Sequence, residues 1–333
     1  MQSLMGETPK TALHRFSEDL FYVKKKRNYT KRLARKIVQQ VLGKDFNSVA
    51  KNQDVSEQEI ETMLKDIAQE KLPEKPSNLK RLGIDEIALV KGQGNYCAVL
   101  VDIDSGKLLD ILDKRTKEEL TKKLLSWGEK TLNKIKEVSI DLCKIYKNLV
   151  SDLMPKAEII ADRFHVTKQV NEELDSRRKT EKKIQESRED NPEKSAILTV
   201  LKNSKYALLK NESDLSETQK EKLESVKAIL PTLGKMHEFK EQLRAIFEST
   251  SNWVDGLFKI ADWLSVAHQY FPKSKKTIIR WIGEIIGYFD NRTTNGVVEG
   301  INNKLKLIKR AAYGFRNFEN FKRRSLLCWY FDS

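Results

Sequence analysis

The spacing of hydrophobic positions changes twice along this chain and divides it into three regions. Residues 33–67 carry apolar side chains at helical spacing, in short groups. Residues 81–166 instead hold short, β-rich apolar runs, separated by turn sequences such as KGQGN and DIDSGK. Residues 167–288 return to helical spacing with many charged positions. We therefore predict a small helical bundle, a mixed α/β region and a long helical region.

The first region predicts three short helices. Ser56 is the expected N-cap of the third helix, and Glu59 completes a capping box. A tight turn before the last of three short helices is typical of a helix-turn-helix. Glu57, Glu59 and Glu61 count against base reading, because they would repel phosphates if that helix entered a DNA groove. The apolar positions are Leu33, Ile37, Val38, Val41 and Leu42, then Phe46, Val49 and Ala50, then Ile60, Met63, Leu64 and Ile67.

The second region follows a polar linker that contains two prolines, and it predicts a mixed sheet. Three antiparallel strands, then a helix, a strand, a helix and a strand give the order β-β-β-α-β-α-β, which is the order of an RNase H-like core. Fold alone does not establish function, so the polar side chains must indicate it. The strands are expected within residues 81–90, 95–104, 107–114, 134–142 and 157–166, and the helices over residues 116–132 and 145–155.

The third region is predicted to be an all-helical insertion. Trp253, Trp263 and Trp281 fall at its apolar positions, where core packing is the preferred interpretation and stacking on bases is the alternative. The predicted fold class is thus α/β with large all-α parts. The predicted divisions are a remnant N-terminal segment (1–23), a helix-turn-helix-like region (24–72), a linker (73–80), the first part of the core (81–170), the insertion (171–288) and the C-terminal core helices (289–333).

Composition narrows the class of partner. Among 333 residues, 62 Lys and Arg outnumber 48 Asp and Glu, so the formal net charge is +14 and nucleic acid is the first partner to test. Three widely separated cysteines show no metal-ligand spacing, which disfavours a disulfide framework and a zinc–cysteine site. No apolar run reaches the roughly 18 residues of a transmembrane helix, and the N-terminus lacks the apolar region of a secretion signal. We expect an intracellular protein that does not span a membrane.

Basic side chains are concentrated around the start of the first predicted helix. Residues 24–36 contain eight of them and no acidic side chain. Such a run is either a solvated helix face or a contact surface for DNA phosphates, and its composition leaves both interpretations open. If the run binds DNA, the contacting residues are Lys24, Lys25, Lys26, Arg27, Lys31 and Arg32.

Three acidic side chains are placed where metal-dependent phosphodiester chemistry would need them. Asp85 interrupts the apolar run of the first strand, Asp141 ends the fourth strand, and Glu299 lies on a helix predicted to begin near Thr294. In an RNase H-like sheet the first and fourth strands are neighbours, so the two aspartates are expected side by side. Two divalent ions that stabilise the attacking and leaving oxygens need only two or three carboxylates. Each acid alone is more simply a surface charge or a lysine partner, and spacing does not decide for the set.

Several blocks of this sequence resemble the DDE transposases of bacterial insertion sequences, in the ISL-three family. The blocks are GIDEIAL, VSIDL, ADRFHV and TNGVVEGINNKLKLIKRAAYGFRNFENFKRR, and the likeness extends over roughly residues 15–330. The last block is the most specific. Its residues at positions typical of the family are Asn295, Gly296, Glu299, Gly300, Asn302, Lys306, Lys309, Arg310, Tyr313, Gly314 and Phe315.

The resemblance implies an RNase H-like fold with a helical insertion, and an acidic triad of Asp85, Asp141 and Glu299. It implies a transposase that cleaves and transfers DNA strands at element ends during DNA transposition, with two Mg²⁺ or Mn²⁺ ions as cofactors. The expected partners are double-stranded DNA, as terminal repeats and as target, and further copies of the chain assembled on that DNA. The expected location is the bacterial cytoplasm, in association with the nucleoid.

The chain departs from the family at its start. Family members usually open with a zinc-binding domain of paired CxxC motifs, whereas the first cysteine here is Cys97. The segment HRFSEDLFYVKKKRNYTKR resembles the sequence that follows that zinc finger, so we expect a chain that is truncated or begins at a late methionine. The alternative function is therefore a catalytically inactive or truncated transposase remnant that acts only as a DNA-binding protein.

Four further polar residues have a functional and a structural interpretation. His165 is either an auxiliary group at the metal or DNA site or a hydrogen-bonded structural histidine. Asp162 is either a fourth acid of the site or the partner of Arg163 or a lysine. Asp102 and Asp104 are interpreted as hairpin-turn residues.

The segment after Glu299 predicts a helix with a basic face. Residues 301–324 contain eight Lys and Arg and only Glu319 as an acid. On a helix, Asn302, Lys306 and Arg310 fall near the face of Glu299, with Lys309 close by, so we expect this row to contact DNA phosphates. Leu305, Ile308 and Ala312 are expected on the opposite, packed side. The alternative is an ordinary amphipathic helix whose lysines are solvated.

Overall fold

The computed structural model describes residues 21–88, 96–293, 296–312 and 317–331. Several sequence features therefore lie outside the described residues: residues 1–20 of the predicted N-terminal segment, the KGQGN turn, Thr294, Asn295 and the Tyr-Gly-Phe at residues 313–315. The chain folds as two units. One combines the residues up to Leu72 with those from Arg310 onward, and the other runs from Pro73 to Lys309.

The first unit is a helical bundle, and its three predicted helices form where expected. They are α1 (Lys31–Gly43), α2 (Phe46–Gln53) and α3 (Glu57–Lys71), which begin at the N-caps Thr30, Asp45 and Ser56. The Ser56–Glu59 capping box is confirmed in both directions. The helices enclose a core that includes Ile37, Val38, Val41, Ile60, Met63 and Leu64.

A fourth helix, α16 (Phe318–Phe331), completes this bundle. The sequence division grouped its residues with the catalytic core, because chain order was the only guide to where it packs. Leu327 is fully buried among the apolar residues of α1 and α3. Polar contacts fix the helix further: the Asn320 amide donates to Glu61 at 2.6 Å, and Arg324 donates to the carbonyl of Leu42 at 3.1 Å.

The start of the basic run is folded as a turn against α3. Val23 and Thr30 pair as an isolated antiparallel bridge, and Lys26 between them has a φ of +62°. The turn is held by Asp66, a buried carboxylate on α3. Its partners are the Lys24 ammonium at 2.8 Å, the Arg27 guanidinium at 2.6 Å and the Tyr29 hydroxyl at 3.0 Å.

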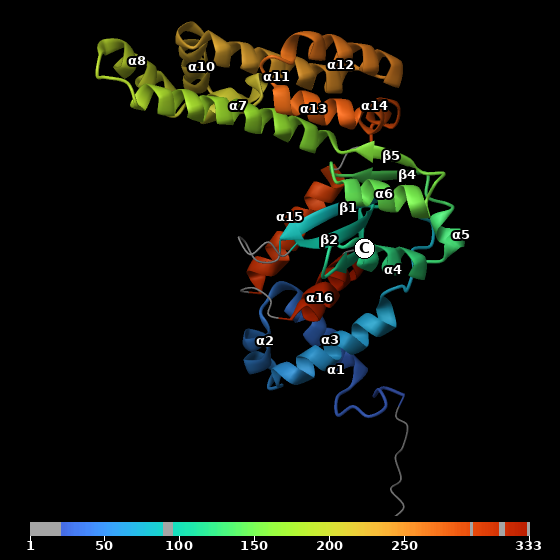
Figure 1. Ribbon diagram of the computed structural model, residues 1–333. Helices are drawn as coiled ribbons and strands as arrows, with labels where there is room; N and C mark the ends of the chain where they lie inside the picture. The colour runs from blue at the N-terminus through green and yellow to red at the C-terminus, as the bar shows by residue number, and fades with distance from the viewer. Residues whose placement is uncertain (1–20, 89–95, 294–295, 313–316, 332–333) are drawn as a thin grey trace, which may run out of the picture. The chain divides into compact units, whose positions relative to one another are not determined.

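The second unit is built on a five-stranded mixed sheet in the order β3-β2-β1-β4-β5 (Figure 1). The strands are β1 (Arg81–Ala88), β2 (Tyr96–Asp102), β3 (Lys107–Leu112), β4 (Glu137–Ile140) and β5 (Glu158–Ala161). The first three pair antiparallel, while β1 with β4 and β4 with β5 pair parallel. The predicted mixed α/β class and the predicted order of strands along the chain are confirmed. The Asp102–Asp104 turn is also confirmed, since Asp102 accepts from the amide of Asp104 at 3.1 Å.

Helices cover both faces of this sheet. On one face lie α4 (Lys117–Ser126), α5 (Glu129–Leu132) and α6 (Lys144–Leu153), packed on Leu82 and Ile84. The single helix predicted over residues 116–132 is wrong, because Gly128, with a φ of +83°, separates α4 from α5. On the other face, α15 (Gly296–Ala311) approaches β1 closely at Gly83. A Cβ there would lie 2.8 Å from Val298, so only glycine allows this contact.

Between β5 and α15, every regular element of the described residues is helical (Figure 1). Trp263 and Trp281 are buried, as predicted, but Trp253 is 46% exposed at the start of its helix, so core packing is wrong for it. No helix in the described ranges combines the length and the apolar character that a membrane span requires. The elements are α7 (Arg163–Glu186), α8 (Pro192–Leu201), α9 (Ser204–Leu209), a 3-10 turn (Glu212–Asp214), α10 (Glu217–Ile229), α11 (Pro231–Ser249), α12 (Trp253–Ala267), α13 (Pro272–Arg280) and α14 (Ile282–Asn291).

We predict that Asp66→Asn destabilises the first unit by about 1–3 kcal/mol at pH 7, since it removes the negative charge and one of the two acceptor oxygens of a partly buried cation network. The Arg27 guanidinium, with Lys24 and Tyr29, holds the pKa of Asp66 well below its usual range. The pKa of this carboxyl is higher in the unfolded chain, so its stabilisation is present above about pH 4 and is lost as the pH falls toward the lower folded value.

Urea unfolding followed by circular dichroism at pH 7 and at pH 3 measures this effect. The control is Glu70→Gln on the same helix, which removes an exposed pair with Arg35 and should change the unfolding free energy by less than about 0.5 kcal/mol. Equal losses in the two variants at pH 7 would contradict the prediction.

Candidate active site

The two aspartates predicted to be neighbours are held together by the parallel pairing of β1 with β4. Ile84 of β1 is in register with Ile140 of β4. Asp85 is the next residue on β1, and Asp141 directly follows the end of β4. The two carboxylates also interact electrostatically, because the charge of Asp85 is one of the causes that raise the pKa of Asp141. The sheet topology thus places both carboxylates where β4 ends beside the middle of β1.

Both oxygens of Asp85 are oriented by hydrogen bonds. Oδ1 accepts from the backbone amide of Glu86 at 2.8 Å, and Oδ2 accepts from the side-chain amide of Asn302 at 2.6 Å. Burial raises the pKa of Asp85, with a further contribution from the charge of Asp162. Asn302, which the sequence suggested as a DNA contact, is only 7% exposed. Its side chain therefore orients Asp85.

Asp141 has the most perturbed carboxyl of the site. Burial, followed by the charges of Glu86 and Asp85, raises its pKa to about 7. Its Oδ1 atom is buried and has no hydrogen-bond partner. A buried carboxylate oxygen without a partner, beside another carboxylate, is costly unless a cation balances it. Oxygen atoms of this kind are the ligands that Mg²⁺ prefers, so the residues fit a divalent ion.

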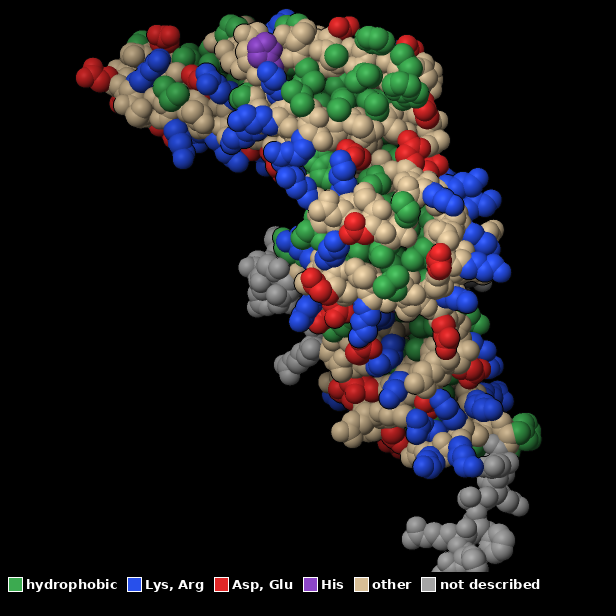
Figure 2. Space-filling view, turned by 45° about the vertical axis from the view of Figure 1, so that its right-hand side comes forward, with side chains coloured by type: hydrophobic (Ala, Val, Ile, Leu, Met, Phe, Trp, Pro, Cys, Tyr) green, Lys and Arg blue, Asp and Glu red, His purple; other side chains and the backbone are tan. Residues whose placement is uncertain are grey.

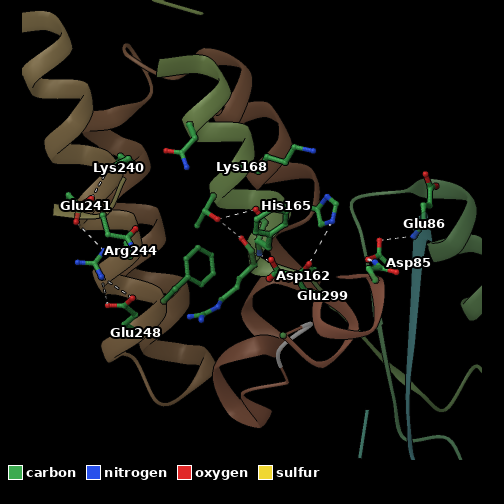
Figure 3. Close-up of a pocket in the computed structure, with 18 of the residues that line it drawn as sticks. Asp85, Glu86, Asp162, His165, Lys168, Lys240, Glu241, Arg244, Glu248 and Glu299 are labelled. Carbon is green, nitrogen blue, oxygen red and sulfur yellow. Dashed lines mark hydrogen bonds and ion pairs between the residues drawn. The ribbon is translucent and has the colours of Figure 1, made fainter. Parts of the chain in front are cut away.

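Glu299 comes to the site on α15, the helix that packs on β1 at Gly83. It lies in the first turn of this helix, its side chain is exposed, and it lines the same cavity as Asp85 (Figure 3). Among the described residues, no group of three or more His, Cys, Asp and Glu is arranged to hold a metal ion. In this structure, Asp85 and Asp141 therefore lie close together as a pair, and Glu299 forms part of the cavity wall.

Asp162 and His165 also line this cavity, at the point where β5 leads into α7. Asp162 is the N-cap of α7, and its carboxylate accepts from the amide of Phe164 at 3.0 Å. The Nε2 atom of His165 lies 3.7 Å from the Asp162 carboxylate. Both residues suggested as auxiliary groups are thus at the site, where Asp162 has a structural capping role.

Glu86 is a further acid of this cavity that the sequence analysis did not select. It accepts a hydrogen bond from the Tyr146 hydroxyl at 3.0 Å and pairs with Arg115. Its charge is the second-largest cause of the raised pKa of Asp141, after burial. The available signal was its position directly after Asp85 in an otherwise apolar strand, but only the fold reveals its proximity to Asp141.

The cations suggested as DNA contacts divide into two groups. Lys24 and Arg27 are bound to Asp66 within the first unit. The others are exposed or half-buried, and Lys306 lines the cavity. These other cations are Lys25, Lys26, Lys31, Arg32, Lys306, Lys309 and Arg310. The predicted packed side of α15 is confirmed by the burial of Leu305 and Ile308.

Comparison with known proteins supplies a family. A family model of DDE transposases of the ISL-three type, described as transposase, matches residues 82–325. The transposase for insertion sequence element IS1557 of Mycobacterium tuberculosis H37Rv is 31% identical over 270 residues, which cover 74% of this chain and 60% of that protein. The transposase for insertion sequence element IS1001 of Bordetella parapertussis is 28% identical over 250 residues, with the same two coverages. The chain thus spans about 60% of the length of these curated relatives.

We predict that Asp141→Asn stabilises the metal-free protein by about 1–3 kcal/mol at pH 8, because it removes an ionised carboxylate from a buried, negatively charged position. Addition of MgCl₂ or MnCl₂ should raise the melting temperature of the unmodified protein and have little effect on this variant. Thermal unfolding with and without each salt measures both effects. The control is Asp152→Asn, which alters an exposed aspartate of α6. An equal metal response in the unmodified protein and in Asp141→Asn would exclude Asp141 as a ligand.

Proposed function

The chain belongs to the ISL-three family of insertion-sequence transposases, and we propose that it is a DDE enzyme that cleaves and transfers DNA strands at the ends of its element. The observation that carries this proposal is the proximity of Asp85, in the middle of β1, to Asp141, which directly follows the end of the adjacent parallel strand β4. Glu299, which lines the cavity with Asp85, would be the third acid. The proposed fold is RNase H-like, and the strand order β3-β2-β1-β4-β5 supports it.

Divalent metal ions are the cofactors that this family generally uses. Two Mg²⁺ or Mn²⁺ ions would stabilise the attacking and leaving oxygens of an in-line displacement at phosphorus. Asp85 and Asp141 would jointly bind the two ions, and Glu299 would be a further ligand of the second ion. The partnerless Oδ1 of Asp141 supports this assignment.

The protein's own groups would act by orientation and charge. Asn302 and the Glu86 amide hold both oxygens of Asp85 before any substrate arrives. Water would attack the phosphodiester at the element end and release a 3′-hydroxyl, which would then attack a phosphodiester of target DNA and displace another 3′-hydroxyl. Such chemistry depends on positioning and charge stabilisation and needs no protein nucleophile.

DNA would be held by basic surfaces outside the acids. The exposed cations at the start of α1 and along α15 support contacts to phosphates. The three helices α1 to α3 support a helix-turn-helix-like role for the first unit, in which Glu59 is held by Asn28 at 3.0 Å and Glu61 by Asn320. Assembly of several copies on element ends, in the bacterial cytoplasm at the nucleoid, is part of the same proposal.

We predict that Asp85→Asn, Asp141→Asn and Glu299→Gln each reduce strand cleavage and transfer by at least about 100-fold, because each removes a carboxylate that would hold a metal ion at the reacting phosphate. DNA binding should persist in all three. A gel assay with a labelled element end and MgCl₂ measures the products, and Asp152→Asn is the control for loss of one exposed charge. Cleavage retained in any variant would remove that residue from the triad. Binding without any cleavage by the unmodified protein would favour the remnant that only binds DNA.

We also predict that Lys306→Ala combined with Arg310→Ala weakens DNA binding equally for different sequences, since phosphate contacts carry no sequence information. The slope of log affinity against log salt should become shallower by about two, one for each lost phosphate contact. Fluorescence anisotropy over a salt series measures this slope. An unchanged slope would mean that these exposed side chains of α15 do not contact the backbone.

A further inference from the structure

The cavity that contains Asp85 and Glu299 extends beyond the acids to the helical insertion. Its volume is about 550 Å³, and its lining changes from β1 and α15 at one end to α7 and α11 at the other. In Figure 3, Asp85 and Glu86 lie on one side, and Lys240, Glu241, Arg244 and Glu248 of α11 lie on the opposite side. A space of this size takes a ligand of the dimensions of a nucleotide.

The α11 side of the cavity carries an arginine that forms ion pairs with acids of its own helix. Arg244 donates from Nε to Glu241 at 3.1 Å and from Nη1 to both oxygens of Glu248, also at 3.1 Å. The Glu248 side chain is 49% exposed, whereas that of Glu241 is 15% exposed. An ion pair with so exposed a partner is weak and is easily exchanged for another anion.

Neighbouring cations of the cavity differ in how firmly they are held. Lys240 is buried, and its ammonium is fixed by the carbonyl of Lys210 at 2.5 Å and by Glu241 at 2.7 Å. Lys168 on α7 is half exposed and has a distant partner, Glu172, at 3.9 Å. Lys240 is therefore structural, while Lys168 and Arg244 are cations that a ligand can recruit. Lys and Arg side chains also gather along the lower edge of the helical part in Figure 2.

We propose that Arg244 and Lys168 form a phosphate-binding site of the helical insertion for the DNA strand next to the cleaved bond, and that Glu248 occupies Arg244 until DNA displaces it. This inference rests on the proposed function, which assigns the acidic end of the cavity to the reacting phosphodiester. An arginine fork matches two phosphate oxygens as well as it matches a carboxylate. The insertion would thereby bind a DNA phosphate where a strand extends across the cavity to Arg244 and Lys168.

The proposal predicts that removal of the acid at position 248 raises the affinity for DNA, whereas removal of the acid at position 238 does not. Glu248→Gln weakens the hold on Nη1 of Arg244, while Nε stays bound to Glu241, and should tighten DNA binding about three- to tenfold. Glu238→Gln is the matched control, because Glu238 is on the same helix and pairs with Lys235 at 2.8 Å, yet neither residue lines the cavity. The two variants change the net charge equally. Misfolding cannot produce the expected gain in affinity.

Fluorescence anisotropy with the full chain tests the proposal. The probe is a labelled duplex taken from the DNA that flanks the coding region, with CaCl₂ in place of MgCl₂ to prevent cleavage. Glu238→Gln should remain within about twofold of the unmodified protein, and Arg244→Ala should bind about three- to tenfold more weakly with a salt slope shallower by about one. Lys168→Ala should change affinity and slope in the same direction as Arg244→Ala.

Equal affinities of Glu248→Gln and Glu238→Gln, or an unchanged affinity and slope in Arg244→Ala, would overturn the proposal. A parallel reaction with MgCl₂ separates this failure from that of the proposed function. If the unmodified protein binds and cleaves the probe while the four variants bind alike, only the phosphate site of the insertion is excluded. If the unmodified protein binds the probe but does not cleave it with MgCl₂, the proposed catalytic function fails whatever the affinities are.

Discussion

The constraint on which this structure depends is the confinement of like charges where β4 ends beside β1. Asp85, Asp141 and Glu86 are each partly withdrawn from water there, and burial together with mutual repulsion raises the pKa of Asp141 to about 7. A fold tolerates such an arrangement only when its surroundings determine it strongly. Three features hold the acids in place here: the parallel pairing of β1 with β4, the close approach of α15 at Gly83, and the hydrogen bond from the Asn302 amide.

On the other side of the cavity, the helical insertion carries positive charges that are paired with acids. The two α11 cations that line the cavity, Lys240 and Arg244, are each paired with acids of the same helix. Arg244 is shared between Glu241 and Glu248, and Lys240 is fixed by a carbonyl and by Glu241. Because the exposed pairs are weak, an arriving phosphate can replace a carboxylate at small cost. The two proposals together would place a polyanion with one phosphate at the metal-binding acids and another at Arg244.

The N-terminal basic run shows how one stretch of charge serves two purposes. Lys24 and Arg27 are partners of the buried Asp66 and hold a turn against α3, while Lys31 and Arg32 lie exposed on α1. Composition cannot distinguish these roles, since the deciding partner is about forty residues away in sequence. Asn302 is a second such case. It belongs to a polar row along α15 in the sequence, yet burial and its bond to Asp85 assign it to the acid site.

The sequence by itself determined the order of elements, the mixed sheet, the helical insertion and the Ser56–Glu59 capping box, because these depend on local periodicity and on side chains a few residues apart. Adjacent placement of Asp85 and Asp141 was predictable only through the expected RNase H-like sheet, in which the first and fourth strands are neighbours. Tertiary structure alone decided the rest. It broke the helix at Gly128, exposed Trp253, assigned α16 to the first unit and revealed Glu86 beside Asp141. These outcomes depend on contacts between residues distant in sequence and on burial, neither of which periodicity along the chain encodes.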